Sequence, residues 1–167
     1  MTRSENLVNY RRGFEKLQSA LQNYPKQAFD YKPAPDKWSI REIILHLADS
    51  ESVGYARCRK IIAESATTIT PYNQDIWAEE LNYKDQDLDL ALELFAQLRL
   101  LTFKLLEKIP EQKWNNYIIH PERGKVTLEE WLGIYSNHVD VHISQMNGNL
   151  AEWQNSKKSK KLNGAIK

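Results

Sequence analysis

Two histidines in the last third of the sequence have a spacing that suits metal binding. His138 and His142 are four residues apart, so on a helix both imidazole rings project from one face. Tyr135, Val139 and Met146 share that face, which we therefore expect to be buried. Buried imidazoles need partners for their nitrogens, and a metal ion engages two rings together. Taken alone, the spacing is more typical of a surface pair or of a hydrogen-bonded core pair.

A third histidine strengthens the metal interpretation. His46 lies one turn after Ile43, on the flank of another apolar stripe, where its ring can face the same interior. Three imidazoles leave at least one coordination position open, as in catalytic rather than structural zinc sites. Such a position favours either an ionised water or a bound thiolate. The corresponding reactions are hydrolysis of an amide or ester, and addition of a thiol to an electrophile.

Carboxylates close to these histidines are candidates for a catalytic base. Asp140 is two positions from either histidine of its helix, which turns it roughly 200° away, so we expect it to face water or a neighbouring subunit. Asp49 follows His46 by three residues, and Asp75 lies in a long connection that could reach the site. Asp49 and Asp75 are therefore the two candidates, although residues 49–51 are also consistent with an exposed face.

Three other residues have simpler interpretations. His120 stands in a turn beside a proline, and we expect it to face solvent rather than to be a ligand. Cys58 lies twelve residues beyond His46, about 18 Å along a helix, and is interpreted as a small core residue. Trp77 is expected to pack against the core, with covering of the site as the alternative.

Four amphipathic segments are expected to position these side chains. Ser39 with Glu42, and Thr127 with Glu130, have the spacing of a capping box at the start of the second and fourth segments. Apolar residues then recur at steps of three and four, as on one face of a helix. The segments are residues 7–24, 40–61, 85–109 and 128–146, and the inward row of the third is Leu88, Leu92, Phe95, Leu98, Leu101 and Leu105.

The sequence therefore predicts an all-α fold, a four-helix bundle with a long loop between its second and third helices. That loop covers residues 66–84 and is rich in aromatic residues. No alternation of the kind that predicts a strand is evident. Residues 1–150 are expected to form one domain, followed by a polar, basic and frayed tail at 151–167.

The charge balance, the cysteine content and the lack of long apolar runs indicate which kinds of partner the protein has. The chain of 167 residues has 23 basic and 22 acidic side chains, a formal charge of +1, which gives no field to attract nucleic acid or an anionic membrane. The single cysteine cannot form an intramolecular disulfide, and no apolar signal core or membrane-spanning run is present. We therefore expect a cytoplasmic protein with a small-molecule substrate, no nucleic-acid partner and no membrane association.

Three stretches resemble the DinB-like superfamily, in particular its YfiT-type members. The resemblance covers essentially residues 1–150. It rests on WSIREIILHLADSE at residues 38–51, on HPERG with the following TL at residues 120–128, and on YSNHVDVHI at residues 135–143.

The resemblance implies a four-helix bundle in which His46, His138 and His142 bind one divalent ion, nickel or zinc, and often a homodimer. Some relatives are metal-dependent transferases that join a low-molecular-weight thiol to an electrophile, and others are described as hydrolases. The sequence is therefore interpreted as a metal-dependent enzyme of one of these two kinds, with a low-molecular-weight thiol as co-substrate in the transferase case. The alternative is a bundle that binds a metal or small ligand for sensing without catalysis.

Overall fold

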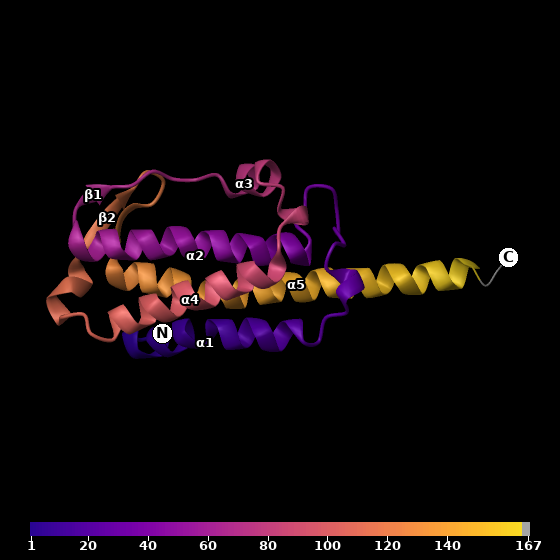
Figure 1. The fold of residues 1–167 in the computed structure, drawn as a ribbon, viewed down its shortest axis with the longest axis horizontal. Helices are drawn as coiled ribbons and strands as arrows, with labels where there is room; N and C mark the ends of the chain where they lie inside the picture. Colours follow the sequence, from indigo (N-terminus) through magenta and orange to yellow (C-terminus); the bar gives the residue numbers. More distant parts are fainter. Residues whose placement is uncertain (165–167) are drawn as a thin grey trace.

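Four long helices form the body of the protein (Figure 1). The structure is a computed structural model that describes residues 1–164. The long helices are α1 (Arg3–Leu21), α2 (Ile40–Ala63), α4 (Leu88–Leu106) and α5 (Leu128–Gly164). Helix α1 packs along α5, and α2 packs along α4 and α5. The predicted four-helix bundle is confirmed.

The two helices that carry the histidines begin with the predicted capping boxes. At α2, the Ser39 amide donates to Glu42 Oε2 at 2.7 Å, and the Glu42 amide donates to Ser39 Oγ at 3.2 Å. At α5, the Thr127 amide donates to Glu130 Oε2 at 2.8 Å, and the Glu130 amide donates to Thr127 Oγ1 at 3.2 Å. These bonds satisfy amides that have no partner within the helix. The start of each helix, and with it the register of its histidines, is thereby fixed.

A small sheet accompanies the bundle, which the sequence did not predict. Strand β1 (Thr67–Thr68) pairs in parallel with β2 (Tyr117–His120), and β2 pairs antiparallel with β3 (Gly124–Thr127). The hairpin turns at Gly124, whose φ of 70° suits glycine. Strands of two and four residues are too short to show an alternating pattern. Ile118 and Val126 anchor the sheet in the core beside α5.

The connection between α2 and α4 is more ordered than the predicted loop. It contains β1, the helix α3 (Gln74–Glu80) and a 3₁₀ turn at Tyr83–Asp85. The Asn73 side-chain oxygen begins α3 by accepting from the amides of Asp75 and Ile76 at 3.0 and 3.1 Å. Further 3₁₀ turns lie at Lys26–Ala28 and Glu111–Asn115.

The predicted frayed tail is wrong for the residues that the structure describes. Helix α5 continues without a break to Gly164 and extends past the other helices in Figure 1. Half-buried Trp153 packs against the core and supports the first turns of this extension. The last part of the predicted tail, residues 165–167, lies outside the described residues. None of the described helices is long and apolar enough to cross a membrane.

The inward row of α4 differs from the prediction at one position. Leu101 is 52% exposed, whereas Arg99 and Thr102 are buried. Arg99 is held by Glu51 of α2, since its Nη2 donates to Glu51 Oε2 at 2.9 Å, and the Tyr10 hydroxyl donates to the other carboxylate oxygen. A hydrophobic pattern cannot reveal an arginine that is buried because it is paired. The predicted exposed face at residues 49–51 is likewise wrong, because Ser50 and Glu51 are buried and Asp49 is half-buried.

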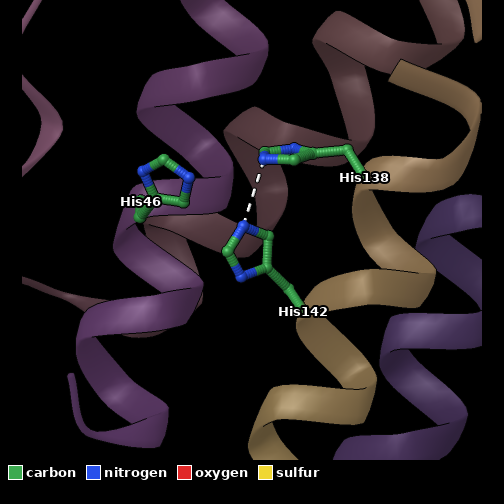
Figure 2. Close-up of side chains that lie close together, drawn as sticks. All are labelled: His46, His138 and His142. Carbon is green, nitrogen blue, oxygen red and sulfur yellow. Dashed lines mark hydrogen bonds between the residues drawn. The ribbon is translucent and has the colours of Figure 1, made fainter. Parts of the chain in front are cut away.

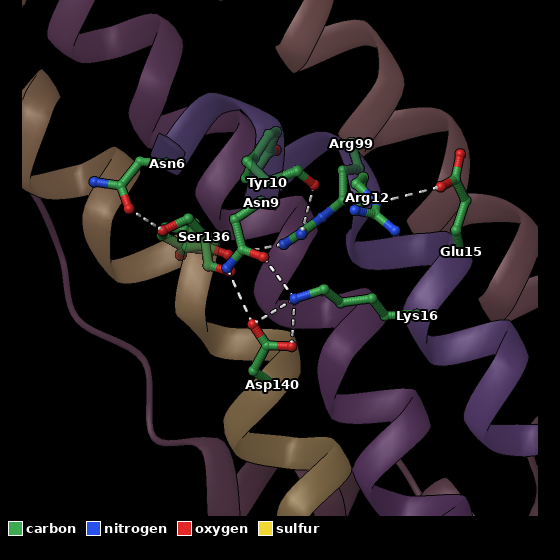
Figure 3. A network of polar contacts seen from close by, with 10 residues as sticks. Asn6, Asn9, Tyr10, Arg12, Glu15, Lys16, Arg99, Ser136 and Asp140 are labelled. Atoms are coloured by element: carbon green, nitrogen blue, oxygen red, sulfur yellow. Dashed lines mark hydrogen bonds and ion pairs between the residues drawn. The ribbon is translucent and has the colours of Figure 1, made fainter. Parts of the chain in front are cut away.

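Polar contacts fix α5 against α1 (Figure 3). Lys16 Nζ lies 2.7 Å from Asp140 Oδ1, and Asn9 donates to Asp140 Oδ2 at 3.0 Å. Ser136 Oγ donates to Asn6 Oδ1 at 2.9 Å one turn earlier. Asp140 thus faces α1, away from the histidine face of its own helix. The rotation of α5 that these contacts set turns His138 and His142 towards α2.

Candidate metal centre

The three predicted histidines meet in the interior of the bundle (Figure 2). His46 comes from α2, and His138 and His142 come from successive turns of α5. One nitrogen from each ring can be chosen so that all three lie within 4.8 Å of one another. The Nε2 atoms of His138 and His142 are 3.1 Å apart, and the His46 ring centroid lies 4.9 Å from that of His142. Two helices that are far apart in sequence therefore supply one cluster.

Burial keeps these imidazoles neutral. It lowers the pKa of His46 to about 3, with a smaller effect of nearby His142. It also lowers the pKa of His138 to about 2, to which His142, His46 and Arg99 contribute. The pKa of His142 is lowered by burial as well, against the opposing effect of its bond to Gln145. At neutral pH all three rings thus carry lone pairs that a cation can share.

Several nitrogens of the cluster lack protein partners. Among the described residues, both ring nitrogens of His46 and Nδ1 of His138 are buried without a hydrogen bond. Buried polar atoms of this kind cost free energy unless something engages them. His142 Nδ1 lies 2.9 Å from Gln145 Oε1, which orients the ring with Nε2 towards the other two.

The donor set fits a divalent transition-metal ion. Imidazole nitrogens suit ions such as zinc and nickel. Zn–N bonds of about 2.0–2.1 Å in tetrahedral geometry place two ligand nitrogens about 3.3 Å apart. The 3.1 Å between the facing Nε2 atoms is close to that separation. A nitrogen of His46 lies within 4.8 Å of a nitrogen of each of the other two rings.

A cleft leads from the surface to the histidines. It has a volume of about 210 Å³, and His46 and His138 line its inner part. Hydroxyl groups and aromatic rings line the walls, and charged side chains of α2 and of the β2–β3 hairpin line the outer part. The lining residues include Ser50, Arg57, Tyr72, His120, Glu122, Arg123, Trp131 and Tyr135.

Tyr135 occupies a space that only glycine leaves open. A Cβ atom at Gly54 of α2 would lie 2.4 Å from the Tyr135 ring. The ring therefore packs flat against α2, stacked on Trp131 with centroids 4.7 Å apart. Burial raises the pKa of Tyr135 to about 12, so its hydroxyl stays protonated at neutral pH.

The two predicted base candidates lie away from this cleft. Half-buried Asp49 accepts a hydrogen bond of 2.5 Å from the Tyr83 hydroxyl. Asp75 is exposed in the first turn of α3 and lines a separate surface hollow with Trp38 and Glu42. The structure thus brings the three histidines together and brings neither carboxylate into the lining of the cleft.

Three other expectations about single residues have clear outcomes. His120 is 9% exposed and lines the cleft, so the expectation that it faces solvent is wrong. It belongs to β2, a strand that sequence patterns did not reveal. Cys58 is buried in the core as predicted, and burial raises the pKa of its thiol to about 12. Trp77 packs on the core cluster and against Tyr72, with ring centroids 4.6 Å apart.

Fold and site together define a helical bundle with a three-histidine candidate metal centre. The family model of the DinB superfamily matches residues 9–146. The chain belongs to this superfamily, as the motifs around His46 and His138 predicted.

Curated relatives carry names that refer to metals. The protein named "Putative metal-dependent hydrolase YfiT" from Bacillus subtilis (strain 168) is 29% identical over 132 residues, which cover 78% of this chain and 74% of the relative. The protein named "Putative metal-dependent hydrolase OB0782" from Oceanobacillus iheyensis is 30% identical over 109 residues, which cover 65% of this chain and 63% of the relative.

Solved structures show the same fold. YfiT from Bacillus subtilis, described as "a probable metal-dependent hydrolase with an unusual four-helix bundle topology", matches with a TM-score of 0.81 at 26% identity. The match covers 88% of this chain and 85% of YfiT. The mycothiol-dependent maleylpyruvate isomerase matches with a TM-score of 0.69 at 15% identity, over 87% of this chain and 61% of the isomerase. At that identity the likeness concerns the fold alone.

Proposed function

We propose that this protein is a metal-dependent hydrolase of a small molecule, and that His46, His138 and His142 hold its divalent ion. One observation carries the proposal. Three neutral imidazoles converge, two of them (His46 and His138) line the inner part of a cleft, and three of the ring nitrogens have no partner among the described residues. The names of the relatives YfiT and OB0782 support the same class of function.

The chain's own residues prepare the site for this chemistry. His46, His138 and His142 would hold the ion, and the chemistry it would supply is acidification of a water and polarisation of a carbonyl group. Burial keeps the imidazoles unprotonated, and Gln145 orients the ring of His142. The hydroxyls of Ser50 and Tyr135 line the cleft and can donate hydrogen bonds to a polar substrate.

The metal and its role can be tested with one substitution. Elemental analysis of protein purified without added metal identifies the ion, for which zinc and nickel are the proposed candidates. His142→Ala should lose the ion and the turnover while its far-ultraviolet circular dichroism is retained. His120→Ala is the matched control, because it removes a cleft histidine outside the proposed ligand set. A bound ion with neither hydrolysis of an ester or amide nor thiol-dependent turnover would favour the sensing alternative.

Thiol addition to an electrophile is the alternative reaction, and a screen of substrates for turnover distinguishes it from hydrolysis. The assay offers esters and amides alone, and then electrophiles such as epoxides or alkyl halides with a low-molecular-weight thiol. Turnover that requires the thiol would replace hydrolysis with thiol transfer and would make the thiol a co-substrate. Asp49→Asn and Asp75→Asn belong in the same screen, since a loss of turnover with the metal retained would identify the predicted base.

The expected partners and location form part of the proposal. Exposed Leu90, Leu94 and Leu101 lie on one side of α4 and support a homodimer formed through that face. Sedimentation of Leu94→Glu should then give a monomer where the unchanged protein gives a dimer. The balanced net charge of +1 supports the absence of a nucleic-acid partner, and the lone buried Cys58 is compatible with the cytoplasm.

A further inference from the structure

The outer part of the cleft has an excess of positive charge. Arg57 of α2 and Arg123 of the β2–β3 turn both line it, together with His120. Among the described residues, Glu122 is the only carboxylate in the lining. The lining therefore contains two guanidinium groups and one carboxylate. In a concave space the low-dielectric walls strengthen the electric field of the excess positive charge.

Neither arginine is neutralised by an acidic partner. Within the described part of the chain, no carboxylate oxygen lies within ion-pair distance of Arg57 or Arg123, although ten such pairs form elsewhere. Arg57 is nevertheless held in place, because its Nη2 donates to the Thr70 carbonyl at 3.2 Å. Its guanidinium also lies 5.9 Å from the centroid of the Tyr72 ring. Its remaining N–H groups are available to a ligand.

The two arginines act on the same point of the cleft. Burial lowers the pKa of His120, and the positive charges of Arg57 and Arg123 lower it further, against the opposing effect of Glu122. Both guanidinium groups therefore lie near the His120 ring, and all three side chains line the same cleft. Arginine suits a small anion because its planar fork matches a carboxylate or a phosphate.

The arginines and the histidines lie at different depths of one cleft. Arg57 follows His46 by eleven residues of α2, which is about three turns and about 16 Å along the axis. Eleven residues also return to nearly the same angle around the helix, about 20° away. Both side chains therefore project from the same face of α2 into the same cleft.

We propose that the substrate is an elongated organic anion whose carboxylate or phosphate binds between Arg57 and Arg123 while its reactive bond lies at the three histidines. This inference rests on the proposed function, because the histidine centre supplies the reacting end. It adds the substrate class: a molecule with an anionic group remote from the bond that reacts.

Binding of a two-ended probe tests this arrangement. Octanedioic acid monohydroxamate carries a metal-binding hydroxamate at one end and a carboxylate at the other, and its monoamide analogue replaces the carboxylate with a neutral group. Calorimetric titration of the zinc-loaded protein should give at least tenfold tighter binding of the carboxylate compound, because hydrogen bonds to a charged group are stronger than those to a neutral one. Arg57→Gln should remove most of this preference, and Arg123→Gln should reduce it.

Two matched variants control for the loss of a positive charge. Arg59→Gln removes a guanidinium from the same helix, where it lies over the Tyr55 ring and outside the cleft lining. Lys125→Gln does the same for the hairpin beside Arg123, since Lys125 lies over the Tyr117 ring. Both should retain the preference for the carboxylate probe. Equal binding of the two probes, or an equal loss in Arg57→Gln and Arg59→Gln, would overturn the proposal.

A measurement on metal-free protein separates this proposal from the proposed function. Inorganic phosphate and acetate are titrated separately while the side-chain N–H resonances of arginine are followed by nuclear magnetic resonance. Saturable shifts of the Arg57 resonance support the anion site even if the protein binds no metal, and the stronger of the two ligands identifies the anion. Metal binding without any such shift, and without the carboxylate preference, leaves the proposed function standing and refutes the anion site.

Discussion

Replacing His46 with leucine should stabilise the metal-free protein. His46 is 2% exposed, and both of its ring nitrogens are buried without a partner. A neutral imidazole has one donor and one acceptor, and each costs about 1–3 kcal/mol when it is buried and unsatisfied. Leucine has a similar volume and no polar atom to bury. After allowance for imperfect packing against Trp38, we expect a gain of roughly 2 kcal/mol in the free energy of unfolding.

The same substitution should have the opposite effect when metal is present. Zinc at one hundred times its dissociation constant adds about 2.7 kcal/mol to the stability of a protein that binds it only when folded. His46→Leu removes one of three proposed ligands and therefore most of this gain. The order of stability of the two proteins is thus expected to reverse between chelator and zinc.

Urea denaturation of both proteins, in chelator and in excess zinc, measures this reversal. His120→Leu is the matched control, because His120 is not one of the proposed metal ligands. Its Nδ1 accepts a hydrogen bond of 3.2 Å from the Glu122 amide, and the substitution removes that bond. It should destabilise the protein equally in both conditions. A lower stability of His46→Leu in chelator, combined with an undiminished response to zinc, would refute the reasoning about the histidine cluster.

Three further outcomes follow from the structure. In metal-free protein the pKa of His46 is lowered from the ordinary 6.5 to about 3. Between these two pH values the imidazole is protonated in the unfolded chain and neutral in the folded protein. The free energy of unfolding should therefore have its full value above pH 6.5. As the pH is lowered from 6.5 to 3 it should fall by about 1.4 kcal/mol per pH unit for each such histidine, which urea denaturation at several pH values would measure. Glu51→Ala leaves the Arg99 guanidinium buried without its partner and should lower the free energy of unfolding by about 3–5 kcal/mol, measured by urea denaturation. Replacing both partners with apolar residues, Glu51 with leucine and Arg99 with methionine, should recover most of this loss. Gly54→Ala places a methyl group 2.4 Å from the Tyr135 ring, so the ring must move into the cleft, and binding of the hydroxamate probes should weaken while far-ultraviolet circular dichroism is retained.

The histidine cluster was predictable because its signals are local. Two capping boxes fix where α2 and α5 begin, and the apolar period then determines which residues face inwards. His138 and His142 share a face by spacing alone. That His46 meets them depends on the packing of α2 against α5, which the resemblance to a known family supplied and periodicity could not.

Other parts of the site depend on contacts between distant segments, which no local pattern encodes. His120 enters the cleft because β2 pairs with both β1 and β3, and strands of two to four residues leave no periodic signal. Arg99 is buried because Glu51 neutralises it across two helices. The continuation of α5 as a helix through a polar stretch also escapes a rule based on apolar stripes.

The separation of the histidines along the chain determines when the centre can assemble during synthesis. His46 leaves the ribosome ninety-two positions ahead of His138, and until α5 has emerged and docked against α2 it has no second ring to share an ion with. If the three histidines are the metal ligands, the growing polypeptide therefore contains only one of them, His46, until His138 has been added. Binding of the ion by all three histidines is then a step that follows the docking of α5 against α2.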